Sequence, residues 1–344
     1  MCDGRETEAP APPKLAVIIT CWNYEDYVVR AIESVQSQAC PDCELVVIDD
    51  GSTDGSWRAI QKTGAQAYCV ENGGQRRACL YGLKKTSAPF ILFLDADDEL
   101  RPGSIATIIA HLDQDVAKLQ FPLIRIDTNR NIISGPIPPL RESRGMQIAE
   151  QILRTGTYAT PPTSGNVFRR DVCHVIAEAV YDTAVDGIIL FSAPFMGATV
   201  SLSEPLGLYR VHGRNDSGMG EHLNSQLLQR DLKLFRDRAE HLRQFLKAYD
   251  RSPELVPAEK TYFYCERSFY LSVSQQDDKR LEKLLPLLKA LWRERRALSS
   301  KLAIGSFFLL TALLPRERAS RGLAYRLQPQ TRSSLGFVQA IMQA

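Results

Sequence analysis

Short, unbroken runs of apolar residues recur along the first third of the chain. Residues 15–19 (LAVII), 45–48 (LVVI) and 90–94 (FILFL) are rich in branched side chains, which is typical of strands buried on both faces of a parallel sheet. A further run at residues 65–70 (AQAYCV) has the composition of a short strand. We therefore expect four strands of one sheet before residue 95.

The segments between these runs have the apolar spacing of helices. In residues 24–38 the side chains of Val28 and Ile32 fall on one helical face, and residues 55–64 and 73–88 have the pattern of two further helices. The alternation of strands and helices predicts an α/β fold with a doubly wound, mostly parallel sheet and right-handed crossovers.

After residue 95 the predicted secondary structure is first mixed and then helical. A helix is expected at about residues 103–112, residues 117–127 and 129–135 are expected to form a hairpin, and residues 205–213 contain a strand. Beyond Glu221 the spacing is helical, which predicts a helical C-terminal region.

The C-terminal region combines apolar character with positive charge. Residues 302–315 (LAIGSFFLLTALLP) are the most apolar stretch, although a transmembrane helix needs about 20 apolar residues. The net charge is +2, but residues 279–344 hold 13 Lys/Arg against 3 Asp/Glu, a net of +10, which leaves −8 for residues 1–278. This segment can lie in the membrane interface. It can equally be a buried helix that closes the C-terminal bundle, and both interpretations stay open.

The N-terminus and the cysteines carry little chemistry. Residues 1–13 lack the basic and apolar segments of a secretory signal and are interpreted as a loose extension of a cytoplasmic protein. Of eight cysteines, only Cys40 and Cys43 are closely spaced, and no second pair follows that would complete a zinc site. Incidental thiols are expected.

Two acidic clusters follow predicted strands. Asp49 and Asp50 follow the second strand, and Asp95, Asp97 and Asp98 follow the fourth. Ligands of such sheets bind beyond the carboxyl ends of the strands. A solvated turn would explain either cluster alone, whereas two clusters at one edge favour a ligand site.

The spacing of these carboxylates suits a hard cation. A D-x-D turn can hold Mg²⁺ or Mn²⁺, which bridges to phosphate oxygens and neutralises a diphosphate leaving group. A carboxylate on a neighbouring strand can accept hydrogen bonds from a base N–H or from ribose hydroxyls. The pattern indicates a metal-dependent enzyme that uses a nucleotide diphosphate. D-x-D also opens haloacid-dehalogenase-type phosphatases, but there a small or β-branched residue follows, where this chain has Asp98.

Three motifs together are far more specific than any one of them. With DDGSTD at 49–54, NGGQ at 72–75 and FLDADD at 93–98, the chain closely resembles family 2 glycosyltransferases of the GT-A fold, of the bacterial surface-polysaccharide type. The resemblance is strong over residues 14–104 and continues more weakly to residue 218.

The resemblance implies roles on the donor side. Asp49 matches the carboxylate that binds the nucleotide base, Asp50 the neighbour that shapes that turn, and Asp95 a residue near the ribose. Thr20 and Trp22 match the loop that lies against the base, where an aromatic ring can stack.

The resemblance also implies which residues bind the metal, act as the general base and lie on the acceptor side. Asp97 matches the metal ligand, with Mn²⁺ or Mg²⁺ as the cofactor, and His212 a late histidine that reaches the metal or the diphosphate. Asp186 matches the motif that carries the general base. The acceptor-side loop of the family corresponds to Ser164, Gly165 and Asn166.

The chain departs from the family pattern at two places. Where relatives often carry a polar pair such as Arg-Asn, this chain has Cys79–Leu80, and a base or phosphate contact is missing unless Arg76 or Arg77 supplies it. Val185 precedes Asp186 where two acidic residues are common.

Several of these residues have structural alternatives. Trp22 could belong to the core, His212 could be a hydrogen-bonded structural histidine, and Asp186 could complement a helix dipole. Caps are expected of Asp54, for the helix at Ser56, and of Asp98, for the turn before Pro102.

These expectations divide the chain into an extension (1–13), a GT-A domain (14–218, with a nucleotide half at 14–104 and an acceptor half at 105–218) and a helical region (219–344) as a candidate membrane contact. The expected function is metal-dependent, inverting transfer from a UDP-linked sugar to a hydroxyl of a saccharide or lipid-linked oligosaccharide, for surface polysaccharide synthesis at the inner face of the cytoplasmic membrane. No nucleic-acid partner is expected.

Two other functions are considered. One is an inactive glycosyltransferase-like scaffold or nucleotide-sugar sensor. The other is a nucleotidyltransferase, which needs a Gly-rich, basic loop after the first strand, where residues 20–27 (TCWNYEDY) offer none.

Overall fold

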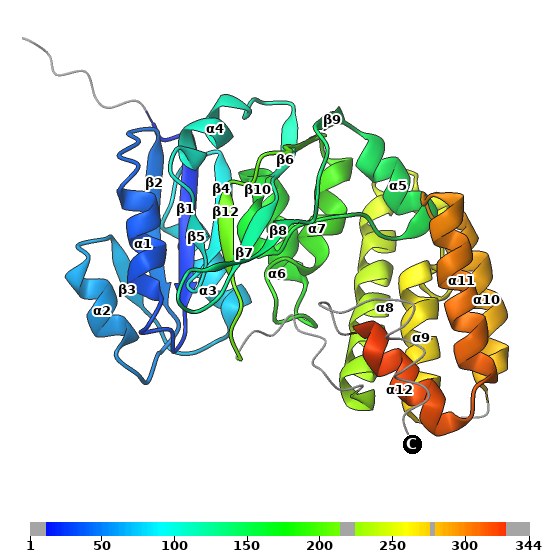
Figure 1. The fold of residues 1–344 in the computed structure, drawn as a ribbon. Helices are drawn as coiled ribbons and strands as arrows, with labels where there is room; N and C mark the ends of the chain where they lie inside the picture. Colours follow the sequence, from blue (N-terminus) through cyan, green and yellow to red (C-terminus); the bar gives the residue numbers. More distant parts are fainter. Residues whose placement is uncertain (1–11, 214–223, 276–278, 328–344) are drawn as a thin grey trace, which may run out of the picture. The chain divides into compact units, whose positions relative to one another are not determined.

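The computed structural model describes residues 12–213, 224–275 and 279–327 (Figure 1). The chain forms two compact units. One contains the residues up to Ala149 together with Ala159–Gly213, and the other contains Glu150–Tyr158 and the C-terminal helices. The expected boundary at residue 218 and nearly all of the expected extension at 1–13 lie outside the described residues.

An eight-stranded sheet forms the centre of the first unit, as Figure 1 shows. Its strands are β1 (Leu15–Cys21), β2 (Cys43–Asp49), β3 (Ala67–Cys69), β4 (Phe90–Asp95), β6 (Val116–Gln120), β9 (Ser143–Gly145), β10 (Asn166–Arg169) and β11 (Ala198–Ser201). The order is β3-β2-β1-β4-β10-β6-β11-β9. The first four strands are mutually parallel, while β10 and β9 run antiparallel to their neighbours. The predicted mixed α/β fold with a mostly parallel sheet is confirmed.

Helices connect the parallel strands at the predicted places. They are α1 (Val28–Gln36), α2 (Ser56–Lys62), α3 (Gln75–Lys84) and α4 (Ser104–Ala110). The helix α1 buries Val28, Ala31, Ile32 and Val35, which are positions of the predicted apolar face. The apolar runs of β1 and β4 are buried because both strands lie inside the sheet.

The first unit also contains a second sheet of four strands, and the hairpin expected at residues 117–127 and 129–135 is only partly correct. Its strands are β5 (Glu99–Leu100), β7 (Leu123–Ile126), β8 (Ile132–Ile137) and β12 (Gly207–Arg210), in the order β5-β12-β7-β8. Only β7 and β8 form a hairpin, while residues 116–120 belong to the large sheet. The run 117–127 is not one strand because Pro122, which has no backbone N–H, separates β6 from β7.

Shorter helices complete the unit. They are α5 (Gln147–Thr155), of which the last residues belong to the other unit, α6 (Val175–Glu178) and α7 (Gly187–Ser192), with 3₁₀ turns at Thr163–Gly165, Arg170–His174 and Ala193–Phe195.

The second unit is a bundle of helices, as predicted for the C-terminal region. It contains α8 (Ser225–Lys247), α9 (Tyr262–Ser274), α10 (Arg280–Arg293), α11 (Leu298–Leu313) and α12 (Arg316–Leu327), with 3₁₀ turns at Ser252–Glu254 and Ala258–Lys260. Its core is formed by side chains such as Phe269, Leu287, Leu291, Phe308 and Leu323.

The apolar stretch at residues 302–315 corresponds largely to α11. This helix buries Phe308, Thr311 and Ala312, so one side of it closes the bundle, but other large apolar side chains of the helix are exposed. Within the described ranges, no helix is long and apolar enough to cross a bilayer.

The close approach of α3 to the sheet gives a first prediction. A Cβ at Gly82 would lie 2.4 Å from Ile18 Cγ2 and 3.4 Å from Ile48 Cγ1, both in buried strands. Overpacking of this kind costs about 1–3 kcal/mol, and helix propensity returns up to about 1 kcal/mol. Gly82→Ala should therefore lower the free energy of unfolding by about 1–2 kcal/mol in urea denaturation.

The matched control is Gly135→Ala in β8. No atom lies within 4 Å of a Cβ at Gly135, so its free energy of unfolding should change by less than about 0.5 kcal/mol. Equal effects of the two substitutions would contradict tight packing at Gly82.

Candidate active site

The ends of β1, β2 and β4 bring the two acidic clusters to one edge of the sheet. In the strand register, Cys21 pairs with Asp49 and Thr20 pairs with Asp95. Because all three strands are parallel, their carboxyl ends meet there. The expected convergence of the two clusters is confirmed.

Asp49 is a fully buried carboxylate with an unused oxygen. Its Oδ2 accepts hydrogen bonds from Ser52 N at 3.2 Å and from Cys69 Sγ at 3.3 Å. Its Oδ1 is buried and finds no hydrogen-bond partner among the residues that the structure describes. Because an unpaired buried carboxylate oxygen is costly, Asp49 Oδ1 is suited to accept a hydrogen bond from a ligand.

Asp50 is engaged within the protein. Its carboxylate accepts hydrogen bonds from Gly73 N at 2.9 Å and Gly74 N at 2.8 Å, and its carbonyl accepts one from Asn72 Nδ2. Gly51 has a φ of +68°, and a Cβ there would lie 2.7 Å from Asn72 N. The DDG turn thus packs directly on the NGG turn before α3.

The loop after β1 carries an exposed aromatic ring. Trp22 is 54% exposed, so the alternative that it belongs to the core is wrong. Neighbouring Asn23 anchors the loop, since its N–H donates to Ser52 Oγ and its Oδ1 accepts from Thr53 N. Thr20 is half-buried in β1. The Trp22 ring is available for stacking because it is exposed.

Asp95 and Asp98 lie at the centre of a dense negative cluster. Asp95 Oδ1 accepts from Gln75 Nε2 at 2.7 Å, and Asp98 Oδ2 accepts from Ser164 Oγ at 2.6 Å. Loss of solvent and then the nearby Asp97 carboxylate hold the pKa of both carboxyl groups well above its usual range. The expected cap of the turn before Pro102 is wrong, because the side chain of Asp98 points into this cluster.

Asp97 is paired with a late histidine. His212 Nε2 lies 2.8 Å from Asp97 Oδ2, and the imidazole stacks on the ring of Tyr27 with centroids 5.4 Å apart. The ring of Tyr24 contacts the same imidazole edge-on. Tyr24 and Tyr27, from the segment just before α1, therefore fix the orientation of the imidazole that pairs with Asp97.

Asp97 and His212 could provide only part of the coordination shell of a divalent cation. Among the described residues, no three His, Cys, Asp or Glu side chains are grouped so as to hold an ion. Mg²⁺ and Mn²⁺ usually keep waters and substrate phosphate oxygens, and two adjacent ligands with bonds of about 2.1 Å lie about 3 Å apart. The 2.8 Å between Asp97 and His212 is compatible with that arrangement, and the surrounding carboxylates favour positive charge.

Asp186 lies on the other side of the same cluster. It immediately precedes α7, and its Oδ2 accepts from Thr163 Oγ1 at 3.1 Å. Its charge contributes to the raised pKa of Asp95. Gln75 links the two sides, because its amide donates to Asp95 and accepts from Val185 N at 3.4 Å. Asp186 is the N-cap residue of α7 but makes no side-chain capping bond to it, so the alternative that its charge complements the dipole of that helix stays open beside the catalytic one.

The loop expected on the acceptor side is buried and forms hydrogen bonds with the acidic cluster of Asp95 and Asp98. Ser164, Gly165 and Asn166 are all buried. Ser164 Oγ donates to Asp98 and accepts from Asp95 N, while Asn166 Nδ2 donates to the carbonyl of Pro162 at 2.8 Å. The polar groups of these residues are thus engaged with the protein.

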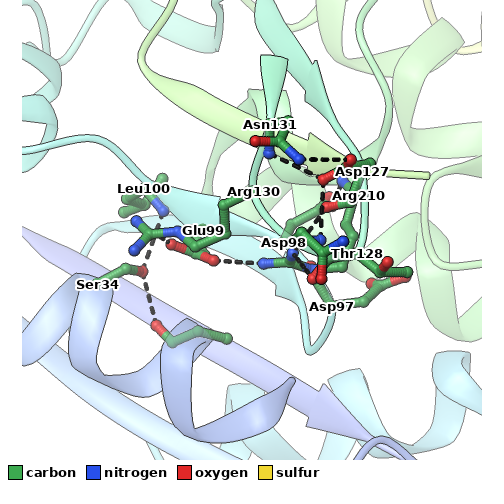
Figure 2. Close-up of polar contacts among 12 residues, drawn as sticks. Ser34, Asp97, Asp98, Glu99, Leu100, Asp127, Thr128, Arg130, Asn131 and Arg210 are labelled. Atoms are coloured by element: carbon green, nitrogen blue, oxygen red, sulfur yellow. Dashed lines mark hydrogen bonds and ion pairs between the residues drawn. The ribbon is translucent and has the colours of Figure 1, made fainter. Parts of the chain in front are cut away.

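Arg210 is a central residue that the sequence interpretation missed. Figure 2 shows its fully buried guanidinium, which donates to the carbonyls of Asp97 at 3.0 Å and Asp127 at 3.1 Å and forms an ion pair with Glu99. The Arg210 N–H donates to Asp98 Oδ1 at 3.0 Å. Arg210 therefore fixes both the backbone and a side chain of the acidic turn.

Two aromatic and ionic contacts extend this network. The guanidinium carbon of Arg210 lies 5.1 Å from the Tyr27 ring centroid, and that ring also stacks on His212. The second oxygen of Glu99 pairs with Arg130 at 2.9 Å (Figure 2). The sequence signal for Arg210 was weak, a lone basic residue in a short strand two positions before His212.

The structure places the departure at Cys79–Leu80 and the two arginines that precede it. Cys79 is buried, and desolvation holds its pKa well above the usual value for a thiol. Arg76 Nη1 donates to the carbonyl of Ile176, and Arg77 lies against Gly73. Arg76 is thus already engaged, and its substitution for the missing contact has no support.

A large, mostly parallel sheet with an acidic edge, followed by helices, is the architecture of the GT-A glycosyltransferase class. Residues 16–176 match the family described as Glycosyl transferase family 2. The chain carries a glycosyltransferase domain that belongs to this family.

Relatives and solved structures agree with this assignment. The chain is 36% identical over 217 residues to an uncharacterised glycosyltransferase of Nostoc sp., covering 59% of this chain and 66% of that protein. It is 33% identical over 88 residues to the Escherichia coli UDP-Glc:alpha-D-GlcNAc-diphosphoundecaprenol beta-1,3-glucosyltransferase WfaP, covering 24% and 35%. The matches thus span less than two thirds of each of these relatives. The structure of S. aureus TarS residues 1–349 has a TM-score of 0.50 and 16% identity, covering 91% of this chain and 83% of that one, and shows the shared fold.

The buried ion pair gives a prediction for stability. Arg210→Met removes the partner of Glu99 and the donors to the Asp97 and Asp127 carbonyls. Breaking a buried pair costs about 3–5 kcal/mol, and we expect a loss of that size in the free energy of unfolding, measured by urea denaturation.

A matched exposed pair serves as the control. Arg144 and Asp113 form an ion pair at 2.7 Å with both side chains about half exposed, so Arg144→Met should cost less than about 1 kcal/mol. A double-mutant cycle of Arg210→Met with Glu99→Gln should give a coupling of about 1 kcal/mol or more. An Arg210→Met effect no larger than that of Arg144→Met would contradict the central role of Arg210.

Proposed function

We propose that this chain is a metal-dependent glycosyltransferase that moves a sugar from a UDP-linked donor to a hydroxyl of a lipid-linked saccharide. The observation that carries the proposal is the unused, buried Oδ1 of Asp49 at the nucleotide edge of the sheet. Uracil offers an N3–H that such an oxygen can accept. The name of the E. coli relative, which states a UDP-glucose donor and a diphosphoundecaprenol acceptor, supports the choice of donor and acceptor.

The remaining donor contacts follow from the same edge. The exposed ring of Trp22 stacks on the base, and Asp95, next to Thr20 in the register, accepts from a ribose hydroxyl. Asp50 acts indirectly, because its carboxylate keeps the NGG turn closed beneath the nucleotide.

Asp97 and His212 are the residues that would hold Mn²⁺ or Mg²⁺. Such an ion, when bound, neutralises the negative charge that develops on the diphosphate leaving group. The stacking of His212 on Tyr27 and the hold of Arg210 on the Asp97 carbonyl keep the two ligands in place before the donor arrives.

Asp186 is the general base in this proposal. Its carboxylate removes the proton of the acceptor hydroxyl, and the hydroxyl oxygen attacks the anomeric carbon as the bond to the diphosphate oxygen breaks. A single displacement with an oxocarbenium-like transition state inverts the anomeric configuration. The buried loop of Ser164, Gly165 and Asn166 supports the acceptor side by fixing Thr163, which donates to Asp186.

A glycosyltransferase-like sensor or scaffold is the second candidate. Two observations favour it: residues 79–80 are not a polar pair, and Arg76 is engaged with the backbone carbonyls of Ile176 and Ala177. A scaffold would bind the nucleotide but the wild-type protein would show no sugar transfer, so the two tests below separate the candidates.

The first test is calorimetric titration of UDP, GDP and TDP with and without Mn²⁺. Asp49→Asn should weaken nucleotide binding about 10- to 100-fold, because the amide cannot satisfy both its protein donors and the base. Asp97→Ala should abolish the Mn²⁺ dependence. The exposed Asp113→Asn is the control and should bind as the wild type does. No nucleotide binding under any condition would refute the donor site.

The second test is turnover of Asp186→Asn with a UDP-sugar and a lipid-linked saccharide. Loss of a general base lowers turnover by about 10²–10⁴-fold, while UDP binding should be unchanged because Asp186 is not part of the base or metal contacts. Asp182→Asn is a matched control, since its carboxylate accepts from Ala184 N in the preceding turn. Equal turnover of Asp186→Asn and the wild type would remove Asp186 from the mechanism.

A further inference from the structure

The helical unit has a large apolar surface that its own core does not use. Its side chains belong to α10 and α11 and are between 47% and 66% exposed. They are Leu281, Leu285, Trp292, Leu298, Leu302, Leu309, Leu310 and Leu313, and we call them the leucine face.

The side chains of the two helices adjoin one another. In Figure 1, α10 and α11 lie side by side, and a Cβ at Gly305 of α11 would lie 3.5 Å from Leu288 Cδ2 of α10. Leu288 and Gly305 each belong to a set of residues on one helix that are four, three and four positions apart. Such spacing keeps side chains on one face of the helix. The sets are Leu281, Leu285, Leu288 and Trp292 on α10, and Leu298, Leu302, Gly305 and Leu309 on α11. The leucine face is therefore continuous across both helices.

The core of the bundle is built from other sides of the same helices. Leu284, Leu287 and Leu291 of α10 and Phe308 and Ala312 of α11 are buried in it. A helix that is apolar all round is normally covered on every side, and large contiguous exposed apolar patches mark interaction surfaces. The leucine face is thus available for a partner without loss of the core.

Positive charge is concentrated in the same part of the chain as this apolar surface. Residues 280–327 contain 11 Lys/Arg and 3 Asp/Glu. The exposed basic side chains are Lys283, Lys289, Arg293, Arg295, Arg296, Arg316 and Arg318. Such a combination suits a surface that offers both hydrocarbon and negative charge.

Trp292 is held at the border between the two kinds of residue. Lys301 Nζ lies 5.6 Å from the centroid of the Trp292 ring and donates to the Trp292 carbonyl at 2.8 Å. Exposed tryptophans next to basic residues are typical of the membrane–water interface.

We propose that the leucine face lies in the interfacial region of an anionic lipid bilayer, with the basic side chains on lipid phosphates. A second copy of this chain fits less well, because it would bring two clusters of net charge +8 together. The inference rests on the proposed function for its purpose, which is access to a lipid-linked acceptor, but its physical test is independent of glycosyl transfer.

The test is co-sedimentation of the full chain with phosphatidylcholine vesicles, with and without phosphatidylglycerol. Wild-type protein should bind the anionic vesicles more tightly, and less so at high salt. The variant L302Q/L309Q/L313Q should bind at least about tenfold more weakly. The control I132Q/V180Q changes two side chains that are at least as exposed, in the other unit, and should bind as the wild type does.

The charge requirement is tested separately with K283E/K289E, which leaves the leucine face unchanged. This variant should lose binding to anionic vesicles about tenfold or more and show a weaker salt dependence. Brominated lipids should quench the emission of Trp292 in wild-type protein, and Trp292→Phe should remove that quenching.

Three outcomes would overturn the proposal. They are no vesicle binding, equal binding of L302Q/L309Q/L313Q and the wild type, and self-association that depends on the leucine face without any lipid binding. Far-ultraviolet circular dichroism verifies that each variant is folded. The UDP titration of the leucine variant should match the wild type, so a failure of membrane binding is distinct from a failure of the donor site.

Discussion

The central constraint on this structure is the burial of several carboxylates at the end of β4. Asp97, Asp98 and Glu99 follow one another and are all buried. Like charges in a medium of low dielectric repel strongly and lose their hydration. The protein compensates with one fully buried guanidinium, Arg210, which binds Glu99 and the backbone of Asp97. The edge of the sheet can be acidic because β12 delivers this cation to it.

The loop at residues 159–166 connects the two sides of the candidate site. Ser164 bonds to Asp98 and to the backbone of Asp95, and the next residue upstream, Thr163, bonds to Asp186. A change in the carboxylates of the donor side therefore reaches Asp186 through two adjacent residues. Gln75 provides a second connection, between Asp95 and Val185. Two hydrogen-bonded paths therefore join the carboxylates at the end of β4 to the segment that carries Asp186.

Features that depend on local pattern could be predicted from the sequence, whereas features that depend on distant partners could not. The apolar runs of β1, β2 and β4 identify buried strands, and the parallel order brings Asp49 and Asp95 together. Arg210 comes more than 100 residues after Glu99, and nothing in its neighbourhood distinguishes a buried arginine from an exposed one. The separation of β6 from β7 was missed because a single proline was read as part of one strand.

The charge distribution along the chain bears on the proposed membrane contact of the helical region. Residues 1–278 carry a net charge of −8 and residues 279–344 a net charge of +10. An anionic surface attracts the second segment and repels the first, over a range of about 8–10 Å at physiological salt. Such a chain approaches that surface with its basic helices first, before any leucine side chain touches hydrocarbon. Electrostatics then selects the orientation and apolar burial provides the affinity, so a loss of either should be visible separately in the salt dependence of binding.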